Sequence, residues 1–453
     1  MFMPPEKQKP ALVAVPPATK DAETHGATLA GPVVQGPSPH GTPTPAARAP
    51  RHIRASAQHI VVPAVLIACA AVNILATDFY APSLAHLPAY FSTTPELAYL
   101  TMSAYFLTAA LAQLVHGPLS ERFGRRRLLL IGYLGFVVAS LLAAVAVSIH
   151  MLIAARVLQA ACGSVSAAAA TPTIRALYEE QRALKILAYF GMFVGVAPAV
   201  GPLLGGYVYV WFGWRAIFLI LALFAAVVWL LVKRFVPETV NIAAAAPLSL
   251  GGALAEYRNI LLRRRSLAVL LPAAFSFGAL FAFIIAAPFI LINGLGVATE
   301  DFGLVFMQMV FAFMLGSFVA ARFAARGYPP MWLFSRSCLC LPFCGLVILA
   351  PVLFGVETVF SVMLGMCLVA FFQGWLIAGA PLTLLGTLRD DMRHGPAVAL
   401  LFSLQFAGGA LAGGLVGGFQ DGSAAPFAWT LTAMTFAGAG LFLILRDGAA
   451  GQN

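Results

Sequence analysis

Residues 97–127 read LAYLTMSAYFLTAALAQLVHGPLSERFGRRR, an apolar run of about 20 residues followed by a short loop that ends in three arginines. An α-helix rises 1.5 Å per residue, so such a run can cross the roughly 30 Å of hydrocarbon in a bilayer. Similar runs, separated by short polar breaks, follow one another from Gln58 onward. They predict twelve transmembrane helices, near residues 59–83, 97–117, 127–148, 151–172, 185–209, 214–236, 267–292, 302–324, 331–354, 357–382, 396–419 and 426–445.

The composition agrees with a membrane location. The chain is 61% hydrophobic and 10% charged, with a mean hydropathy of +0.90, whereas a soluble domain carries roughly 25% charged residues. A chain this apolar cannot cover its surface in water. We therefore expect a multi-pass protein of the bacterial inner membrane, most of whose surface faces lipid.

The basic residues are confined to alternate loops. Of 27 Lys and Arg residues, all lie in the N-terminal tail, the even-numbered loops, their flanks or the C-terminus, except Arg215 and the intramembrane Arg156. Cytoplasmic loops carry an excess of Lys and Arg, so both termini are predicted to be cytoplasmic. The same placement explains the net charge of +10 without nucleic acid as a partner.

The chain divides into parts of different composition. The Pro-rich N-terminal tail cannot bury enough apolar area to order itself, and a polar, basic linker separates two sets of six helices. Two halves with a site between them are the usual plan of secondary transporters. The predicted parts are a disordered cytoplasmic tail (1–55), an N-terminal half (56–236), a cytoplasmic linker (237–266), a C-terminal half (267–446) and a short tail (447–453).

The loop GPLSERFGRRR, from Gly117 to Arg127, carries a motif. Its two glycines permit a tight reversal, and Glu121 can face a helix N-terminus or a guanidinium. A plain topology loop would explain the arginines but not this spacing of Gly and Glu. The loop resembles the signature loop of the major facilitator superfamily, with Glu121 where Asp is usual. That resemblance implies a latch between the halves on the cytoplasmic side, formed by Gly117, Glu121, Arg122, Gly124, Arg125 and Arg126.

The predicted fifth helix reads GMFVGVAPAVGPLLGGYV and is rich in Gly and Pro. Two prolines among glycines predict a kinked helix with a bare face that a neighbour can approach closely. The stretch resembles a motif of exporters in the same superfamily, although the early glycine of that motif is Ala197 or displaced. The resemblance implies antiport through Gly195, Pro198, Gly201, Pro202, Gly205 and Gly206.

Further segments narrow the resemblance to one branch. The segments SAYFLTAALAQLVHGPLSERFGRR, YEEQRAL, WRAIF and PET (237–239) are similar to the bicyclomycin/chloramphenicol-resistance (Bcr/CflA) branch of drug/proton antiporters. The similarity is strong over 58–240 and rests mainly on topology in the C-terminal half. It implies an all-α membrane protein with two six-helix pseudo-repeats, the major facilitator fold.

Two charged residues fall inside predicted helices. Asp78 is the only acid placed within a span, and Arg156 precedes Gln159 by three residues, as in an Arg-x-x-Gln-Gly pattern of the family with Ala160 here. A central arginine costs at least about 2.5 kcal/mol and needs a partner or a wet cavity. By elimination, Asp78 and Arg156 are predicted to pair and to couple transport to protons. The alternatives are that Asp78 lies at the interface near Pro82, or that Arg156 reaches the membrane edge.

Aromatic and amide residues on the cavity-lining helices of the resembled fold are candidates for substrate binding, since aromatic faces with sparse amides suit amphiphilic ligands. Ordinary helix packing is the alternative for each one. Some relatives carry a second acid where this chain has Ala70, so neutral or weakly charged substrates are expected rather than dications. The candidates are Tyr105, Gln113, Gln159, Tyr189, Phe275, Phe371, Gln373 and Gln405.

No catalytic signal emerges. The sequence has no glycine-rich phosphate-binding loop followed by Lys-Ser or Lys-Thr. The cysteines Cys338, Cys340 and Cys344 are expected to pack in helices rather than bind metal. The sequence predicts a monomeric, proton-driven exporter of drug-like molecules, with no enzyme activity, cofactor or metal. An importer of a metabolite on the same fold and a non-transporting membrane sensor or scaffold are the alternatives.

Overall fold

The computed structural model describes residues 58–242, 250–388, 392, 394–420 and 423–447. The predicted tail 1–55 and nearly all of the tail 447–453 lie outside the described residues, as do Arg389 and Arg393. In the described part, twelve helical segments are long and apolar enough to cross a membrane, which confirms the predicted number.

The first half holds six of these segments. The segment Ile60–Phe91 is composed of α1 and two short helices, and Ile149–Leu177 is composed of α5 and α6. The elements are α1 (Gln58–Asp78), η1 (Ala81–His86), α2 (Leu87–Phe91), α3 (Pro95–Phe123), α4 (Arg125–Ala144), α5 (Ile149–Gly163), α6 (Val165–Leu177), α7 (Glu180–Phe212) and α8 (Trp214–Phe235).

The second half holds the other six. A short linker helix precedes it, and a π-helical stretch extends its first transmembrane helix. The elements are α9 (Leu250–Leu261), α10 (Arg264–Pro288), η3 (Phe289–Gly294), α11 (Phe302–Ala325), α12 (Pro330–Leu353), α13 (Val359–Leu385), α14 (His394–Gly418) and α15 (Ala425–Asp447).

Two features differ from the sequence prediction. The helix expected at 151–172 is divided after Gly163, where Ser164 ends α5 and donates its hydroxyl to the Ala160 carbonyl. Glycine next to a serine that bonds back to the preceding turn is a common cause of such a break. The linker 237–266 contains α9, whose Tyr257 hydroxyl donates to the Leu114 carbonyl of α3 at 2.9 Å.

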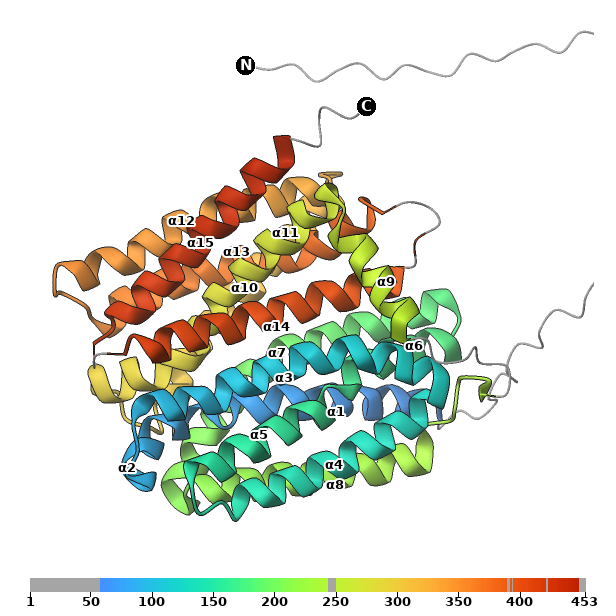
Figure 1. Cartoon of the computed structure of the whole chain (residues 1–453), viewed down its shortest axis with the longest axis horizontal. Coiled ribbons are helices and arrows are strands. Elements are labelled where there is room, and N and C mark those ends of the chain that lie inside the picture. The colour runs from blue at the N-terminus through green and yellow to red at the C-terminus, as the bar shows by residue number, and fades with distance from the viewer. Residues whose placement is uncertain (1–57, 243–249, 389–391, 393, 421–422, 448–453) are drawn as a thin grey trace, which may run out of the picture. The chain divides into compact units, whose positions relative to one another are not determined.

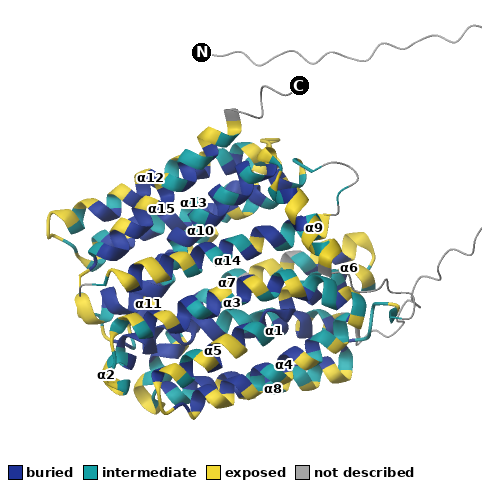
Figure 2. Cartoon of the chain, in the orientation of Figure 1, coloured by how far each residue is buried: buried dark blue, intermediate teal, exposed yellow. Residues whose placement is uncertain are grey.

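The halves meet along two helix pairs. In Figure 1 the helices of the second half lie above those of the first, and α3 lies beside α14. The helix α7 packs against α11 in the same way. Large apolar residues remain exposed on outward faces, as on α4 and α8 in Figure 2, for example Ile131, Leu134, Leu219 and Leu223. An exposed apolar face of this kind fits a helix that contacts lipid.

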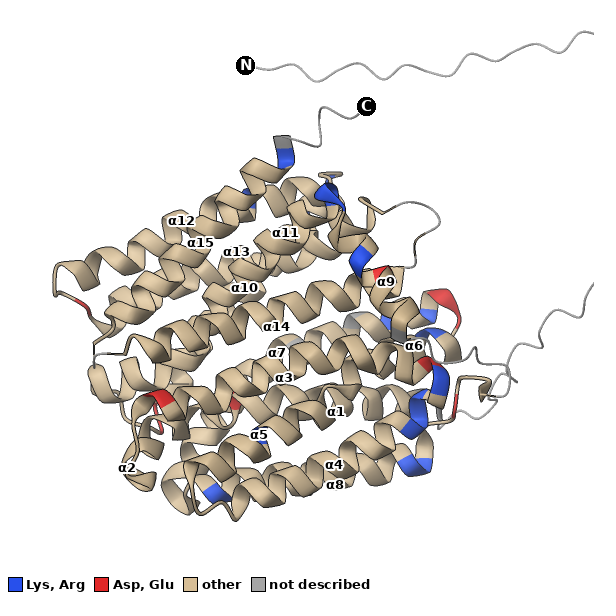
Figure 3. Cartoon of the chain, in the orientation of Figure 1, with Lys and Arg blue, Asp and Glu red and all other residues tan. Residues whose placement is uncertain are grey.

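Apart from Arg156 and Arg215, the described basic residues gather at one end of the helices, which we call the basic end (Figure 3). The opposite end carries Arg215, which contacts Tyr90 and Trp214. It also carries four acids in its loops and helix starts, Glu96, Glu300, Asp301 and Glu357. The separation follows the loop-by-loop count made from the sequence, and we expect the basic end to be cytoplasmic.

Candidate functional site

Arg156 lies at the centre of the first half with its side chain fully buried. One guanidinium nitrogen, Nη1, donates to the Ala76 carbonyl at 2.8 Å and to Gln159 Oε1 at 2.5 Å. The other, Nη2, lies 3.3 Å from Met102 Sδ. These carbonyl and amide oxygens stabilise the guanidinium, whose burial in hydrocarbon would otherwise cost free energy.

Two tyrosine rings cover the same guanidinium. The Arg156 Cζ atom is 4.2 Å from the ring centroid of Tyr105 and 4.7 Å from that of Tyr80. Aromatic faces attract a cation most strongly where water is excluded. The structure therefore does not support the alternative in which Arg156 reaches the membrane edge, because protein encloses the side chain.

An outer layer of polar groups fixes this cluster. The Tyr105 hydroxyl donates to Asn73 Oδ1 at 2.6 Å, and Gln159 Nε2 donates to Ser140 Oγ at 2.8 Å. The Tyr80 hydroxyl shares a hydrogen bond of 3.0 Å with Thr101. We call the following residues the arginine cluster: Arg156, its contacts Ala76, Tyr80, Met102, Tyr105 and Gln159, and Asn73, which binds Tyr105.

The sequence prediction found only three members of the arginine cluster. It missed Asn73 and Tyr80, although a helical signal was present: with Ala76 they follow the i, i+3, i+7 spacing of one helix face. That face of α1 and its continuation points to Arg156. Asp78 lies roughly 140° further round a helix with 3.6 residues per turn than Asn73 does.

The predicted ion pair between Asp78 and Arg156 is not formed. Asp78 Oδ1 accepts a hydrogen bond of 3.1 Å from the Thr77 hydroxyl, and the carboxylate makes no ion pair with a described residue. The reason is rotational, because the α1 face that meets Arg156 is not the face that bears Asp78. Asp78 is only 6% exposed, so protein encloses its side chain.

Asp78 instead contacts the glycine-rich helix α7. A Cβ atom built on Gly201 would lie 2.8 Å from the Cβ of Asp78. One turn later, a Cβ on Gly205 would overlap the Phe79 carbonyl oxygen. Only glycine allows α7 to approach α1 this closely, so these two residues of the predicted motif place α7 directly on the acid.

The same stretch of α7 reaches the second half. A Cβ on Gly206 would collide with the Thr299 carbonyl oxygen, and a Cβ on Gly303 would overlap the backbone of Leu203. Gly195, by contrast, meets no neighbouring element within 4 Å. The close-packed part of the motif, Gly201 to Gly206, thus touches both α1 and the start of α11.

Side chains join the halves at the same end. His86 Nε2 shares a hydrogen bond of 2.9 Å with Thr299 Oγ1, and the His86 ring stacks on Tyr209 with centroids 4.4 Å apart. Asn293 Nδ2 donates to the Ala85 carbonyl at 3.1 Å. The seam between η1, α7 and residues 293–303 is therefore closed at the opposite end.

The signature loop is built around an acid that the sequence prediction did not assign to it. Gly124 joins α3 to α4 with a φ of 94°, a conformation that favours glycine. Glu238 accepts hydrogen bonds from the backbone N–H groups of Arg125 at 2.9 Å and Arg126 at 3.2 Å, at the start of α4. An anion is favoured at a helix N-terminus. Of the two positions expected for Glu121, the helix N-terminus is taken by Glu238, and Glu121 interacts electrostatically with the Arg125 guanidinium.

The arginines of the loop bind neighbouring elements. Arg125 Nη1 donates to the Pro172 carbonyl of α6 and to Thr239 Oγ1, each at 3.1 Å. Arg126 Nη2 donates to the Lys233 carbonyl of α8 at 2.7 Å. These contacts connect the loop to the first half and the start of the linker. That the signature loop acts as a latch between the two halves stays a prediction.

The predicted substrate residues are not gathered in one place. Tyr105 and Gln159 belong to the arginine cluster, while Gln373 is fully buried in the second half, where Nε2 donates to the Ser276 carbonyl and Oε1 has no partner among the described residues. Phe371 packs with Trp375 in an aromatic group, and Tyr189 is 49% exposed. Gln113 and Gln405 are buried and Phe275 is half-buried.

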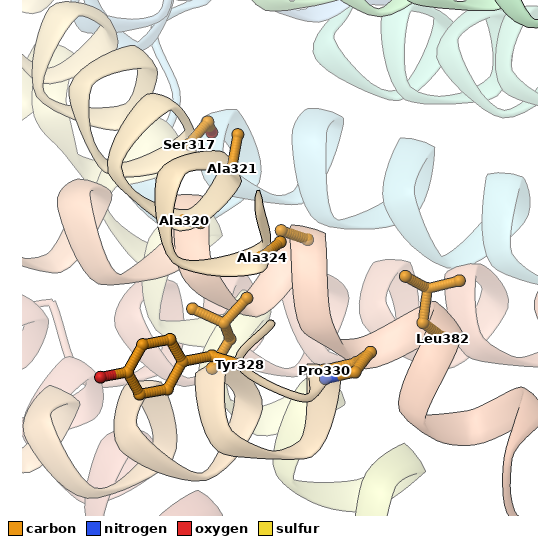
Figure 4. Close-up of a pocket in the computed structure, with 9 residues that line it drawn as sticks. Ser317, Ala320, Ala321, Ala324, Tyr328, Pro330 and Leu382 are labelled. Carbon is orange, nitrogen blue, oxygen red and sulfur yellow. The ribbon is translucent and has the colours of Figure 1, made fainter. Parts of the chain in front are cut away.

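A small cavity of about 100 Å³ lies between α11, α12 and α13 (Figure 4). Its lining includes Ser317, Ala320, Ala324, Tyr328 and Leu382, and has no charged side chain. It contains none of the predicted site residues, so we do not assign it to the transport path.

Comparison with known proteins gives a consistent result. The family model described as Major Facilitator Superfamily matches residues 66–413. A bicyclomycin resistance protein homolog of Haemophilus influenzae is 28% identical over 79% of this chain and 88% of that protein. A chloramphenicol resistance protein of Pseudomonas aeruginosa is 31% identical over 75% and 79%, and multidrug resistance protein D of Escherichia coli is 28% identical over 76% and 85%.

Solved structures share the fold at low sequence identity. The inward-facing, unoccupied structure of a bacterial homolog of the human lysosomal transporter Spinster aligns with a TM-score of 0.64 and 15% identity, covering 87% of this chain and 96% of that chain. A D-xylose–proton symporter aligns with a TM-score of 0.64 and 14% identity over 84% and 96%.

Proposed function

The chain belongs to the major facilitator superfamily, and from this premise we propose that it is a proton-coupled exporter of small amphiphilic compounds, neutral or weakly charged. The superfamily is a family of membrane transporters, and the chain is a multi-pass protein of the bacterial inner membrane. The names of its relatives support drug-like substrates, because they refer to resistance to bicyclomycin, chloramphenicol and multiple drugs.

The observation that carries the proposal is the contact between Asp78 and α7. A buried carboxylate with a single hydrogen-bond donor is costly when charged, because nothing replaces the water it has lost. Adding a proton removes that cost. Protonated Asp78 therefore favours the close packing of α7 on α1, and deprotonated Asp78 favours their separation.

This difference between the protonated and deprotonated states of Asp78 can drive a transport cycle. With the opposite end open, Asp78 would take up a proton from outside as the substrate leaves. The end would then close through the seam of η1, α7 and residues 293–303. Release of the proton to the cytoplasm and binding of substrate at the basic end would return the protein to its outward-open state. Alternation of two such states is the general mechanism of secondary transporters.

The arginine cluster gives the substrate path a fixed positive charge. Arg156 is bound by carbonyl, amide and aromatic groups rather than by Asp78, so its position does not depend on the protonation of that acid. A fixed guanidinium repels dications, and its N–H groups can donate hydrogen bonds to neutral ligands. We propose that Tyr105 and Gln159 contact the substrate beside it.

A resistance panel tests the proposal. The unmodified chain, expressed in a pump-deficient host, is expected to raise resistance to neutral antibiotics such as chloramphenicol, and a protonophore should remove the effect. Asp78→Asn should abolish gradient-driven efflux with normal expression. Glu357→Gln, an acid of the opposite end that lies outside this seam, is the matched control and should keep it. Full efflux by Asp78→Asn would exclude this residue from the coupling.

The direction of transport needs its own measurement. In everted vesicles, an exporter that exchanges drug for protons accumulates substrate when the vesicle interior is acidic. Accumulation that requires the reverse gradient would instead favour a metabolite importer on the same fold.

A further inference from the structure

Tyr257, in the linker helix α9, takes no part in the arginine cluster, in the seam or in the contact of Asp78 with α7. Its side chain is nevertheless buried, with 8% exposed, and its hydroxyl donates to the Leu114 carbonyl of α3 at 2.9 Å. This bond joins the linker to the first half of the protein. The carbonyl that it binds is one that α3 itself leaves without its usual donor.

The usual donor is missing because of Pro118. In an α-helix the N–H of each residue bonds to the carbonyl four residues earlier, so the Leu114 carbonyl would be bound by the N–H of residue 118. Pro118 lies inside α3 and has no N–H. A carbonyl enclosed by protein without a donor costs free energy. The Tyr257 hydroxyl therefore takes the place of the missing N–H.

Leu114 is on the face of α3 that meets the second half. On the same face, Ser103 packs on Gly413 of α14. Two turns later, the Ala110 carbonyl accepts the Ser403 hydroxyl of α14 at 2.8 Å. Leu114 follows Ala110 by four residues and so lies one turn further along this face. The acceptor of the tyrosine bond is thus at the boundary between the halves.

The donor side of the bond is fixed to the second half. The helix α9 packs on α10 and α14, at the right of Figure 1. At the start of α10, Arg264 Nη2 donates to the Ile444 carbonyl of α15 at 2.9 Å. The Ser266 hydroxyl shares a hydrogen bond of 3.2 Å with the Thr387 hydroxyl. The tyrosine bond therefore crosses from one half to the other, and its length depends on how the two halves are placed.

From these observations we propose that Tyr257 is a positioning residue of the transport cycle, which favours the state with the opposite end closed. Its bond to the Leu114 carbonyl is present together with the closed seam of η1, α7 and residues 293–303. Rotation of the halves that opens the seam moves α9 relative to α3 and leaves the carbonyl without a donor. The inference rests on the alternation of the halves in the proposed function, but not on its substrate or on protons.

Tyr257→Phe tests the inference, because it removes the hydroxyl and keeps the ring. The reporter is Thr299→Cys, at a position that is 9% exposed in the closed seam, in the full chain in nanodiscs. Its labelling rate with a maleimide follows the fraction of molecules whose seam is open, after subtraction of labelling in the same variant without the reporter. The rate should rise about fivefold in Tyr257→Phe, the factor for one hydrogen bond of average net strength.

Tyr133→Phe is the matched control. The Tyr133 hydroxyl of α4 donates to the Cys69 carbonyl of α1 at 2.7 Å, and both helices belong to the first half. This variant loses a buried hydrogen bond of the same kind, but one that does not cross the boundary between the halves. Its labelling rate should equal that of the unmodified chain. A comparable rise in both variants would overturn the inference, since loss of stability alone would then explain it.

A second background separates the hydrogen bond from the packing of the ring. Pro118→Ala gives α3 its own N–H donor for the Leu114 carbonyl, so Tyr257→Phe should no longer change the labelling rate. An equal rise with and without Pro118→Ala would contradict the role of the hydroxyl, and no rise in Tyr257→Phe alone would exclude this residue from control of the seam. None of these rates depends on a substrate or a proton gradient. Failure of chloramphenicol efflux would therefore overturn the proposed function and leave this inference standing.

Discussion

At the scale of the residue, Arg156 is a buried charge that, among the described residues, has no carboxylate partner, and the geometry of its contacts depends on a planar guanidinium. It donates to two oxygens and lies within 4.7 Å of the centroids of two tyrosine rings, and a compact ammonium does not reproduce this planar arrangement. We predict that Arg156→Lys reduces transport at least about tenfold and destabilises the protein by about 2 kcal/mol, although the charge is kept. Efflux assays and thermal unfolding in detergent measure both effects. Arg182→Lys, whose guanidinium lies over the Tyr178 ring at an exposed site, is the control and should change neither quantity.

At the scale of the element, α7 is a helix whose glycines have different surroundings. Gly205 touches the Phe79 carbonyl of α1, whereas Gly195 meets no neighbouring element within 4 Å. We predict that Gly205→Leu forces α7 away from α1 and opens the opposite end, while Gly195→Leu does not. Thr299→Cys, placed in the seam, reports the opening through its labelling rate with a membrane-impermeant maleimide. The rate should rise at least about tenfold in the Gly205 variant, because a side chain cannot share the space of a buried carbonyl. Equal labelling in both variants would show that this contact does not control the seam.

At the scale of the whole molecule, the halves are joined by few polar contacts. His86 and Thr299 meet at the opposite end, and further along the helices Ser403 of α14 donates to the Ala110 carbonyl of α3, while Tyr257 of the linker helix α9 donates to the Leu114 carbonyl. Alternating access requires the opposite-end contacts to separate in each cycle. We predict that a short bis-reactive crosslink between His86→Cys and Thr299→Cys stops transport completely, and that the two single variants with the same reagent keep it. Transport by the crosslinked pair would mean that the seam does not open during the cycle.

The signature loop belongs to the same scale, because its central acid comes from elsewhere in the chain. Glu238 lies 113 positions after Arg125 and accepts the N–H groups at the start of α4. We predict that Glu238→Gln destabilises the fold by about 1 kcal/mol, since it removes the anion from a helix N-terminus. Thermal unfolding measures this loss. Glu256→Gln, on α9 outside the α4 N-terminus, is the comparison and should lose less.

The sequence by itself determined the twelve spans, the separation of basic and acidic ends, and the glycine-rich surface of α7. Each of these follows from a local rule: the thickness of hydrocarbon sets the length of a span, and a missing side chain is visible in the sequence. Asp78 and Arg156 were likewise identified as unusual by their position in apolar runs.

Only the tertiary structure decided what these residues contact. The rotation of α1 turns Asn73, Ala76 and Tyr80 toward Arg156 and leaves Asp78 against Gly201, so elimination by charge alone chose the wrong partner. Glu238, at the α4 N-terminus, also joins segments more than a hundred residues apart. Partners of this kind depend on helix rotation and on the packing of two halves, which no local pattern in the chain encodes.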